Sequence, residues 1–120
     1  MGKINTFKDI IAWQKAHGLA LEVYKATSTF PRSEEFALSS QMRRAAVSIP
    51  SNIAEGFSRK TLKDTSHFYN ISEGSLEELK YQLLLARDLL YIKPADYDKL
   101  SLLSDEVGKV LCVWKRNQKY

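Results

Sequence analysis

Cysteine, glycine and proline are scarce in this sequence. Its 120 residues include one cysteine, Cys112, which excludes an intrachain disulfide and a zinc site made of clustered cysteines. A single cysteine also favours a reducing compartment. With 5 glycines and 3 prolines, the chain lacks the material for the many tight turns of an all-β fold. It also contains no phosphate-binding loop of the GxGxxG or Walker type.

Long apolar runs are missing as well. No stretch approaches the roughly 18 apolar residues of a membrane span, and charges interrupt the N-terminal region where a secretory signal needs an unbroken apolar core. We therefore expect a cytoplasmic protein with no membrane contact. Apolar residues make up 44% and charged residues 27% of the chain, as is typical of globular proteins. The length predicts a single domain over residues 1–120.

Helical periodicity is the main pattern that is present. Apolar residues recur at steps of three and four in four segments, which predicts helices over about 6–29, 33–57, 62–91 and 96–114. The expected buried face of the first helix consists of Ile10, Trp13, His17, Ala20, Tyr24 and Thr27. The expected buried face of the second helix consists of Leu38, Met42, Ala45, Ile49, Ile53 and Gly56.

Proline and polar residues mark the helix boundaries. Ser33 and Asp96 are the expected N-caps of the second and fourth helices. Pro50 lies inside the second helix pattern, yet the apolar period continues in phase across it, so we predict one kinked helix rather than two. The connections are short, and short connections make neighbouring helices antiparallel. The expected fold class is all-α: an up-down-up-down antiparallel four-helix bundle with a proline-kinked second helix.

Residues for catalysis or metal binding form no recognisable pattern. A metal site in a helical bundle needs Glu-x-x-His pairs, and neither His17 nor His67 has a glutamate three positions earlier. Asp64, Ser66 and His67 are close in sequence, but neighbours on a helix point apart and do not form a triad. We interpret His17 as a hydrogen-bonded core residue, His67 as a surface residue and Cys112 as a small core residue. The sequence predicts a protein that is not an enzyme and binds no cofactor or metal.

A polar stripe runs along the second predicted helix. At about 100° per residue, one line on the helix surface carries Gln41, Arg44, Ser48, Ser51 and Glu55. Arg44 and Glu55 are too far apart to pair with each other, so each is expected to find a partner in another helix, another subunit or a ligand. Two interpretations are open. The first is that the stripe is an ordinary solvated face, and the second is that it forms a subunit interface or a buried polar network. In the second case, the residues expected to set helix packing or subunit register are Arg44, Ser48, Pro50, Asn52, Glu55 and Gly56.

Basic residues outnumber acidic residues by 18 to 14, which gives a formal net charge of +4. This excess permits an anionic partner without requiring one, and cations also favour helix C-termini for electrostatic reasons alone. The turn after the second helix and the end of the fourth lie at the same end of an up-down bundle, so their cations are expected to form one basic rim. Lys3 and Lys8 are expected at the opposite end. The candidate phosphate-binding residues are Arg43, Arg59, Lys60, Lys63, Lys115, Arg116 and Lys119.

Residues 41–56 read QMRRAAVSIPSNIAEG, a long run with a proline inside a helix. This run resembles the signature of the four-helix proteins encoded in intervening sequences of bacterial 23S rRNA genes, sometimes labelled S23 ribosomal proteins. The resemblance implies a four-helix bundle with a kinked second helix. It extends over almost the whole chain, through Phe7-Lys8-Asp9, Trp13-Gln14-Lys15-Ala16, Tyr24, Phe30-Pro31 and Gly74-Ser75-Leu76-Glu77-Glu78-Leu79.

The resemblance also implies partners. Related bundle proteins form homopentamers and include accessory variability proteins of diversity-generating retroelements, which associate with nucleic acid and a reverse transcriptase. We therefore expect a non-enzymatic homo-oligomer, with a pentamer favoured, that binds RNA or DNA through backbone phosphates, RNA being favoured. The alternative is a protein-interaction scaffold, for example an accessory partner of a reverse transcriptase, whose positive charge is incidental.

Overall fold

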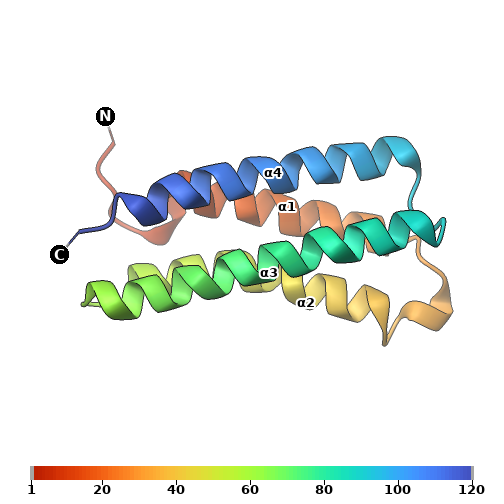
Figure 1. Ribbon diagram of the computed structural model, residues 1–120, viewed down its shortest axis with the longest axis horizontal. Helices are drawn as coiled ribbons and strands as arrows, with labels where there is room; N and C mark the ends of the chain where they lie inside the picture. The colour runs from red at the N-terminus through yellow and green to blue at the C-terminus, as the bar shows by residue number, and fades with distance from the viewer. Residues whose placement is uncertain (1, 120) are drawn as a thin grey trace.

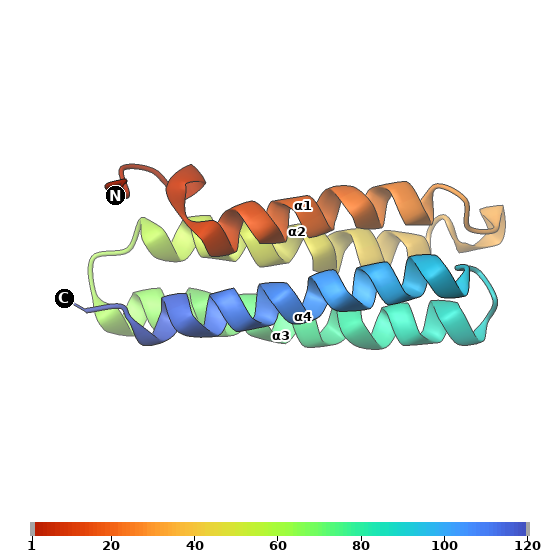
Figure 2. The same ribbon diagram turned by 90° about the horizontal axis from the view of Figure 1, so that it is seen from above.

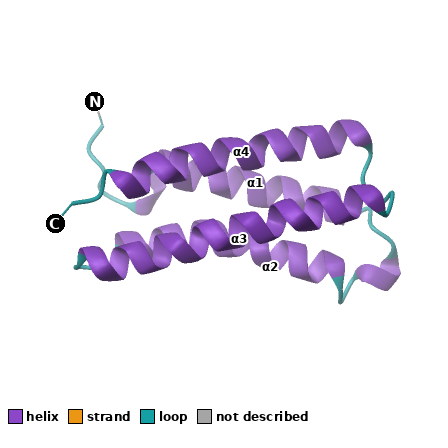
Figure 3. Cartoon of the chain, in the orientation of Figure 1, coloured by secondary structure: helices purple, strands orange, loops and turns teal. Residues whose placement is uncertain are grey.

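Every regular element of the chain is a helix in the part that the computed structural model describes, residues 2–119 (Figure 3). The all-α fold class predicted from the periodicity is therefore confirmed. In chain order the elements are the 3₁₀ helix η1 Phe7–Asp9, α1 Ile11–Thr27, the 3₁₀ helix η2 Arg32–Glu34, α2 Leu38–Phe57, α3 Leu62–Asp88 and α4 Pro94–Arg116.

The four α-helices form an up-down-up-down bundle, as predicted (Figures 1 and 2). Each helix runs antiparallel to the next, α2 makes its most extensive contact with α3, and α1 packs on α4 to close the ring. The bundle measures 46 × 27 × 19 Å along its principal axes. This topology brings the start of α1, the end of α2, the start of α3 and the end of α4 to one end of the molecule (Figure 1).

α2 is one continuous helix that passes through Pro50, as predicted, but it begins later than predicted. Ser33 does not cap it, because Ser33 lies in η2 and the chain turns at Ala37 before the helix starts. The first N–H of α2 is satisfied from the preceding segment instead: the backbone N–H of Leu38 donates to the carboxylate of Glu34 at 3.2 Å.

Local hydrogen bonds explain the other N-terminal starts. The Thr6 hydroxyl accepts from the N–H of Lys8 at 3.2 Å. The Asp9 carboxylate accepts from the N–H of Asn5 at 2.9 Å and of Thr6 at 3.0 Å. These two backbone donors lower the pKa of Asp9, since they favour its charged form. α4 begins at Pro94, two residues before its predicted cap, because proline is well accommodated in the first turn of a helix.

The predicted buried face of α2 is confirmed at every position. The predicted face of α1 is partly wrong: Trp13 is only half-buried, and His17 and Tyr24 are exposed. Two faces of α1 carry apolar side chains. The face with the smaller side chains is buried, because it allows the neighbouring helices to approach closely. The face with the larger side chains is left at the surface of the bundle. The residues of α1 that face the core are Ala12, Ala16, Leu19, Ala20, Val23 and Thr27.

α3 ends with a residue in the left-handed region. Leu90 has φ 65° and is 88% exposed, and the N–H of Tyr91 closes the helix end by donating to the carbonyl of Ala86 at 2.9 Å. The Tyr91 hydroxyl then donates to the Glu34 carboxylate at 2.8 Å, and this hydrogen bond raises the pKa of Tyr91. The α3–α4 turn is thereby tied to η2.

Candidate nucleic-acid interface

The candidate interface is the end of the bundle at which both chain termini lie (Figure 1). The α2–α3 turn and the end of α4 meet there, as predicted. The prediction that Lys3 and Lys8 lie at the opposite end is wrong, because the first helix of an up-down bundle starts where the fourth helix ends. Ile4 and Trp114 line one shared apolar groove, which fixes the N-terminal segment beside the end of α4. We call this region the basic end; its cations are Lys3, Lys8, Arg59, Lys60, Lys63, Lys115, Arg116 and Lys119.

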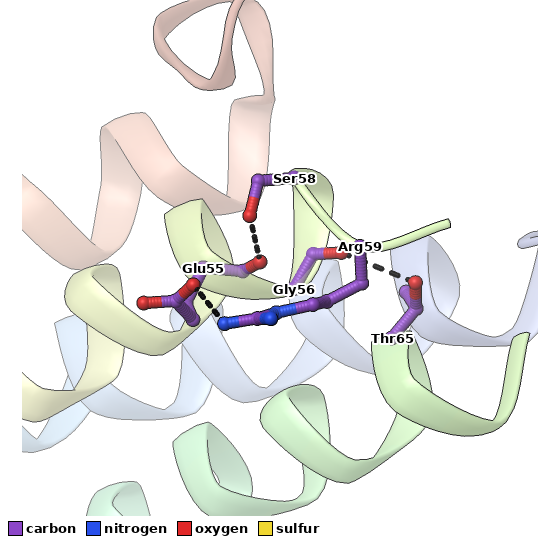
Figure 4. Close-up of polar contacts among 5 residues, drawn as sticks. All are labelled: Glu55, Gly56, Ser58, Arg59 and Thr65. Atoms are coloured by element: carbon purple, nitrogen blue, oxygen red, sulfur yellow. Dashed lines mark hydrogen bonds and ion pairs between the residues drawn. The ribbon is translucent and has the colours of Figure 1, made fainter. Parts of the chain in front are cut away.

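Two cations of the basic end are paired within the chain. Arg59 forms an ion pair with Glu55 (Figure 4), and its guanidinium lies 4.6 Å from the ring centre of Phe68. Lys115 donates to the carboxylate of Glu73 at 2.9 Å, which links α4 to α3. Ion pairs as exposed as these contribute about 0–1 kcal/mol. The ion pairs themselves therefore contribute little to holding these two side chains in place.

The other cations of the basic end are exposed and make no ion pair with any residue between 2 and 119. They are Lys3, Lys8, Lys60, Lys63, Arg116 and Lys119. We call them the unpaired cations. No carboxylate of the described chain neutralises them at contact distance, so they present positive charge to solvent.

Close packing of α2 on α3 positions the turn that carries part of this charge. Gly56 is buried, and a Cβ atom at this position would lie 2.6 Å from Cε1 of Tyr69. The Thr65 hydroxyl donates to the Gly56 carbonyl at 3.1 Å (Figure 4). The Tyr69 hydroxyl accepts from the indole N–H of Trp114 at 2.9 Å. These contacts join α2, α3 and α4 directly beneath the basic end.

Arg43, a candidate phosphate ligand by sequence, does not lie at the basic end. Its Nε donates to the Thr27 hydroxyl at 2.8 Å and its Nη2 donates to the Tyr24 carbonyl at 3.3 Å. Its guanidinium also lies 4.7 Å from the centre of the Tyr24 ring. These contacts place Arg43 beside the last turn of α1, at the other end of the bundle.

Part of the polar stripe on α2 forms hydrogen bonds at the contact with α3. The hydroxyls of Ser48 and Ser75 are 2.7 Å apart, and Asn52 donates to the carbonyl and the hydroxyl of Ser48 at 2.8 and 3.0 Å. One bond was not anticipated: the buried Ser72 hydroxyl donates to the Ile49 carbonyl at 2.8 Å. The sequence signal for it was the small residue at position 72, which lets the helices approach.

The two charged residues of the stripe behave differently. Glu55 pairs with Arg59, one turn further along the chain, so within the described chain its partner is not in another helix. Arg44 is exposed and makes no hydrogen bond or ion pair within residues 2–119.

An apolar groove between α1 and α2 was missed by the sequence reasoning. It has a volume of about 530 Å³ and is lined mainly by apolar and aromatic side chains. His17 lines it and stacks on Trp13 with ring centres 4.9 Å apart, so the interpretation of His17 as a core residue is wrong. Leu21 and Tyr24 border the groove and are 59% and 44% exposed. The apolar period of α1 did identify residues that line this groove, but from the sequence they were interpreted as core residues.

Other sequence interpretations concern single residues or whole-chain properties. Cys112 is exposed, so its assignment to the core is wrong; its neighbour Leu111 occupies the buried position. Within residues 2–119, no three or more His, Cys, Asp or Glu side chains lie close enough together to hold a metal ion. None of the described helices combines the length and apolar character that crossing a bilayer requires.

Comparison with known proteins agrees with the fold. A crystal structure of a protein of unknown function from the S23 ribosomal protein family of Bacteroides thetaiotaomicron matches with a TM-score of 0.79 and 25% identity, over 89% of this chain and 100% of that chain. No curated protein matches the sequence. Residues 8–112 match the family model described as 23S rRNA-intervening sequence protein. Since this match spans most of its length, the chain belongs to the 23S rRNA-intervening sequence protein family.

Proposed function

We propose that the protein is a non-enzymatic, cytoplasmic helical bundle that binds nucleic acid through backbone phosphates, with RNA as the favoured ligand. The observation that carries the proposal is the group of unpaired cations at the basic end. Lysine and arginine contacts to phosphate supply affinity without reading the sequence. The description of the family, which names an intervening sequence of 23S rRNA, favours RNA over DNA.

Helix electrostatics account for Arg116, in the last turn of α4, but not for the cations at the starts of helices. Lys63 lies in the first turn of α3, and Lys60 directly precedes the Thr61 cap of that helix. Lys8 lies three residues before α1. The N-terminus of a helix carries partial positive charge, so a cation there is unfavourable by a few tenths of a kcal/mol, roughly 0.3–1. An anionic ligand would remove this repulsion. Phosphate binding therefore explains why cations occupy these positions, whereas simple solvation does not.

Assembly of several copies is the second part of the proposal, with five as the favoured number on the resemblance to pentameric relatives. The apolar groove between α1 and α2 supports it, because apolar side chains such as Leu21 gain from being covered. Arg44 lies beside this groove, near Tyr24 and Val47, has no partner among residues 2–119 and is positioned to pair across a subunit contact. A ring of five would raise the formal charge from +4 to roughly +20.

The same groove favours one alternative function. If it is covered by a different protein, the chain is an interaction scaffold, for example an accessory partner of a reverse transcriptase. The groove would then carry the function, and the charge of the basic end would be incidental.

A salt titration tests the nucleic-acid proposal. Binding of a labelled single-stranded RNA is followed by fluorescence anisotropy at several salt concentrations, and each neutralised phosphate should add about 0.7 to the slope of log affinity against log salt. The double variant Lys60→Glu, Lys63→Glu should lower both the affinity and the slope. A matched control, Lys25→Glu with Lys93→Glu, changes the net charge equally at the opposite end and should bind nearly as well as the wild type.

The salt titration has three possible outcomes. Loss of slope in the first variant alone supports binding at the basic end. An equal loss in both variants would mean that only net charge matters. Absence of binding at low salt would discard the nucleic-acid function and leave the scaffold, whose partner would be sought among proteins.

A further inference from the structure

A second polar region lies at the end of the bundle opposite the basic end. A pocket of about 310 Å³ opens there between the last turn of α1, the η2 segment and the first turns of α2. Phe30 and Pro31 form part of its wall, and polar or charged side chains form the rest. No residue of the basic end contributes to it. Its chemistry is therefore independent of the function proposed above.

Arg43 lies in this pocket in a fixed orientation. Its Nε and Nη2 atoms donate to the Thr27 hydroxyl and the Tyr24 carbonyl, and the Tyr24 ring supports the guanidinium from one face. Thr27 is itself 4% exposed. The Nη1 amino group makes no hydrogen bond to any described residue. A guanidinium held in this way keeps its remaining donors oriented, so little side-chain entropy is lost when they bind an anion.

Ser39 is the second unusual residue of the pocket. It is 6% exposed and lines the pocket, yet its hydroxyl makes no hydrogen bond within residues 2–119. Its oxygen is not among the fully buried atoms that lack a partner, so it is accessible from the pocket that Ser39 lines. A ligand in the pocket can therefore accept a hydrogen bond from this hydroxyl without displacing a protein partner.

Open backbone donors lie in the first turn of α2, the helix that contributes Ser39 and Arg43 to the pocket. The N-cap residue of α2, Ala37, supplies no side-chain hydrogen bond to the helix. In its first turn the Leu38 N–H is taken by Glu34 and the Gln41 N–H by the Ala37 carbonyl. The N–H groups of Ser39 and Ser40 between them have no acceptor in the described chain. Open N–H groups at a helix N-terminus, together with the helix dipole, favour an anion.

The charges around the pocket are mixed but favour an anion. Arg32 lines it, is exposed and has no ion pair within the described chain, so it adds a second guanidinium to that of Arg43. Glu35 also lines the pocket and opposes an anion. The nearby Glu34 is occupied by Tyr91 and Leu38 and does not compete.

From these donors we propose that the pocket binds a phosphate group. The Arg43 Nη1 amino group, Arg32 and the hydroxyl and backbone N–H of Ser39 donate to its oxygens. The phosphate is either the free anion or the terminal phosphate of a nucleic-acid strand, which share this chemistry. The site lies at the far end of the bundle from the basic end, so its failure and the failure of the nucleic-acid proposal are separate results.

Titration of the full chain with inorganic phosphate tests the site. The ionic strength is held constant with chloride, and amide NMR shifts or heat are recorded. We expect saturable binding, with shifts centred on Ser39 and Ser40. Arg43→Gln should weaken binding about tenfold or more, and Glu35→Gln should strengthen it. Lys63→Glu, at the basic end, should leave the phosphate affinity unchanged.

Ser39→Ala separates a ligand site from a structural role. Because its hydroxyl has no hydrogen-bond partner within the described residues, this variant should melt at the wild-type temperature without phosphate, while losing several-fold in phosphate affinity. Lack of saturable binding, or unchanged binding in both Ser39→Ala and Arg43→Gln, would overturn the proposal. So would loss of phosphate binding in Lys63→Glu, since it would place the bound anion at the basic end.

A pair of oligonucleotides identifies the source of the phosphate. If a 5′-phosphorylated RNA binds more tightly than its 5′-hydroxyl counterpart, and Ser39→Ala removes the difference, the site takes the end of a strand. If the two RNAs bind equally while inorganic phosphate still saturates the pocket, the ligand is the free anion. Both results support a phosphate site.

Discussion

Gly56→Ala should destabilise the protein, although alanine is the better helix former. Within α2 the exchange gains at most about 1 kcal/mol of helix propensity. The added Cβ, however, would lie 2.6 Å from Cε1 and 2.9 Å from Cδ1 of Tyr69, and 3.3 Å from Cβ of Phe68. Tyr69 is 1% exposed, so its ring cannot move into solvent. Its hydroxyl is also held by the indole N–H of Trp114 at 2.9 Å.

The magnitude follows from these competing effects. Overpacking of this kind costs about 1–3 kcal/mol, and disturbing the hydrogen bond between Tyr69 and Trp114 adds about 1 kcal/mol. After the propensity gain is subtracted, we expect a net loss of about 1–3 kcal/mol in the free energy of unfolding. For a chain of this length that corresponds to a fall in Tm of roughly 4–12 °C.

Gly74→Ala provides the matched control, because Gly74 is exposed on α3 and a Cβ there meets no atom within 4 Å. This variant should gain about 0.5–1 kcal/mol. Urea and thermal unfolding followed by circular dichroism measure both changes, with similar m-values expected. If Gly56→Ala were as stable as the wild type while Gly74→Ala gained stability, the close approach of α2 to Tyr69 would not be a constraint, and the reasoning would be refuted.

Three further predictions concern single side chains. Arg44→Ala should change the oligomer size measured by light scattering more than Arg59→Ala does, because Arg59 is paired within its own chain; equal effects would contradict the separation of their roles. Leu90→Gly should raise the free energy of unfolding by up to about 1 kcal/mol by relieving a left-handed conformation, whereas Leu89→Gly should lower it, as urea titration would show. Asp9→Asn should remove an acid-range pH dependence of stability. Because hydrogen bonds lower the pKa of Asp9 from its ordinary 3.8, its contribution is complete above that value and is lost as the pH falls through the lowered folded value. The melting temperatures of wild type and this variant should therefore converge at the lowest pH, and a constant difference would argue against this cause.

The bundle could be predicted from the sequence because its helices are long and their periods are regular. In α2 the apolar positions form one narrow face, and Met42, Ile49 and Ile53 are buried as expected. In α1 two faces are apolar, and periodicity alone does not say which one is inside. The buried face carries small residues such as Ala16, and the choice depends on how closely the neighbouring helices approach.

The start of α2 and the location of Arg43 could not be predicted, because both depend on contacts between distant segments. Ser33 has the local signature of a cap, but Glu34 is engaged by Tyr91, 57 residues further along the chain. Arg43 was grouped with other cations by charge, whereas Thr27 and Tyr24 determine its position. The location of Lys3, in contrast, could have been deduced correctly from the sequence, because in a bundle of four antiparallel helices the first helix starts where the fourth one ends.

The even number of helices in the bundle has a practical consequence. With four antiparallel helices, any segment joined to either terminus leaves the molecule beside the cations of the basic end (Figure 1). An acidic tag there would compete with RNA from within the same molecule, and a polyhistidine tag would add positive charge as the pH falls toward 6. Fluorophores and immobilisation handles for binding assays are better attached in the α3–α4 turn, where the exposed Lys93 offers a position at the far end of a 46 Å bundle.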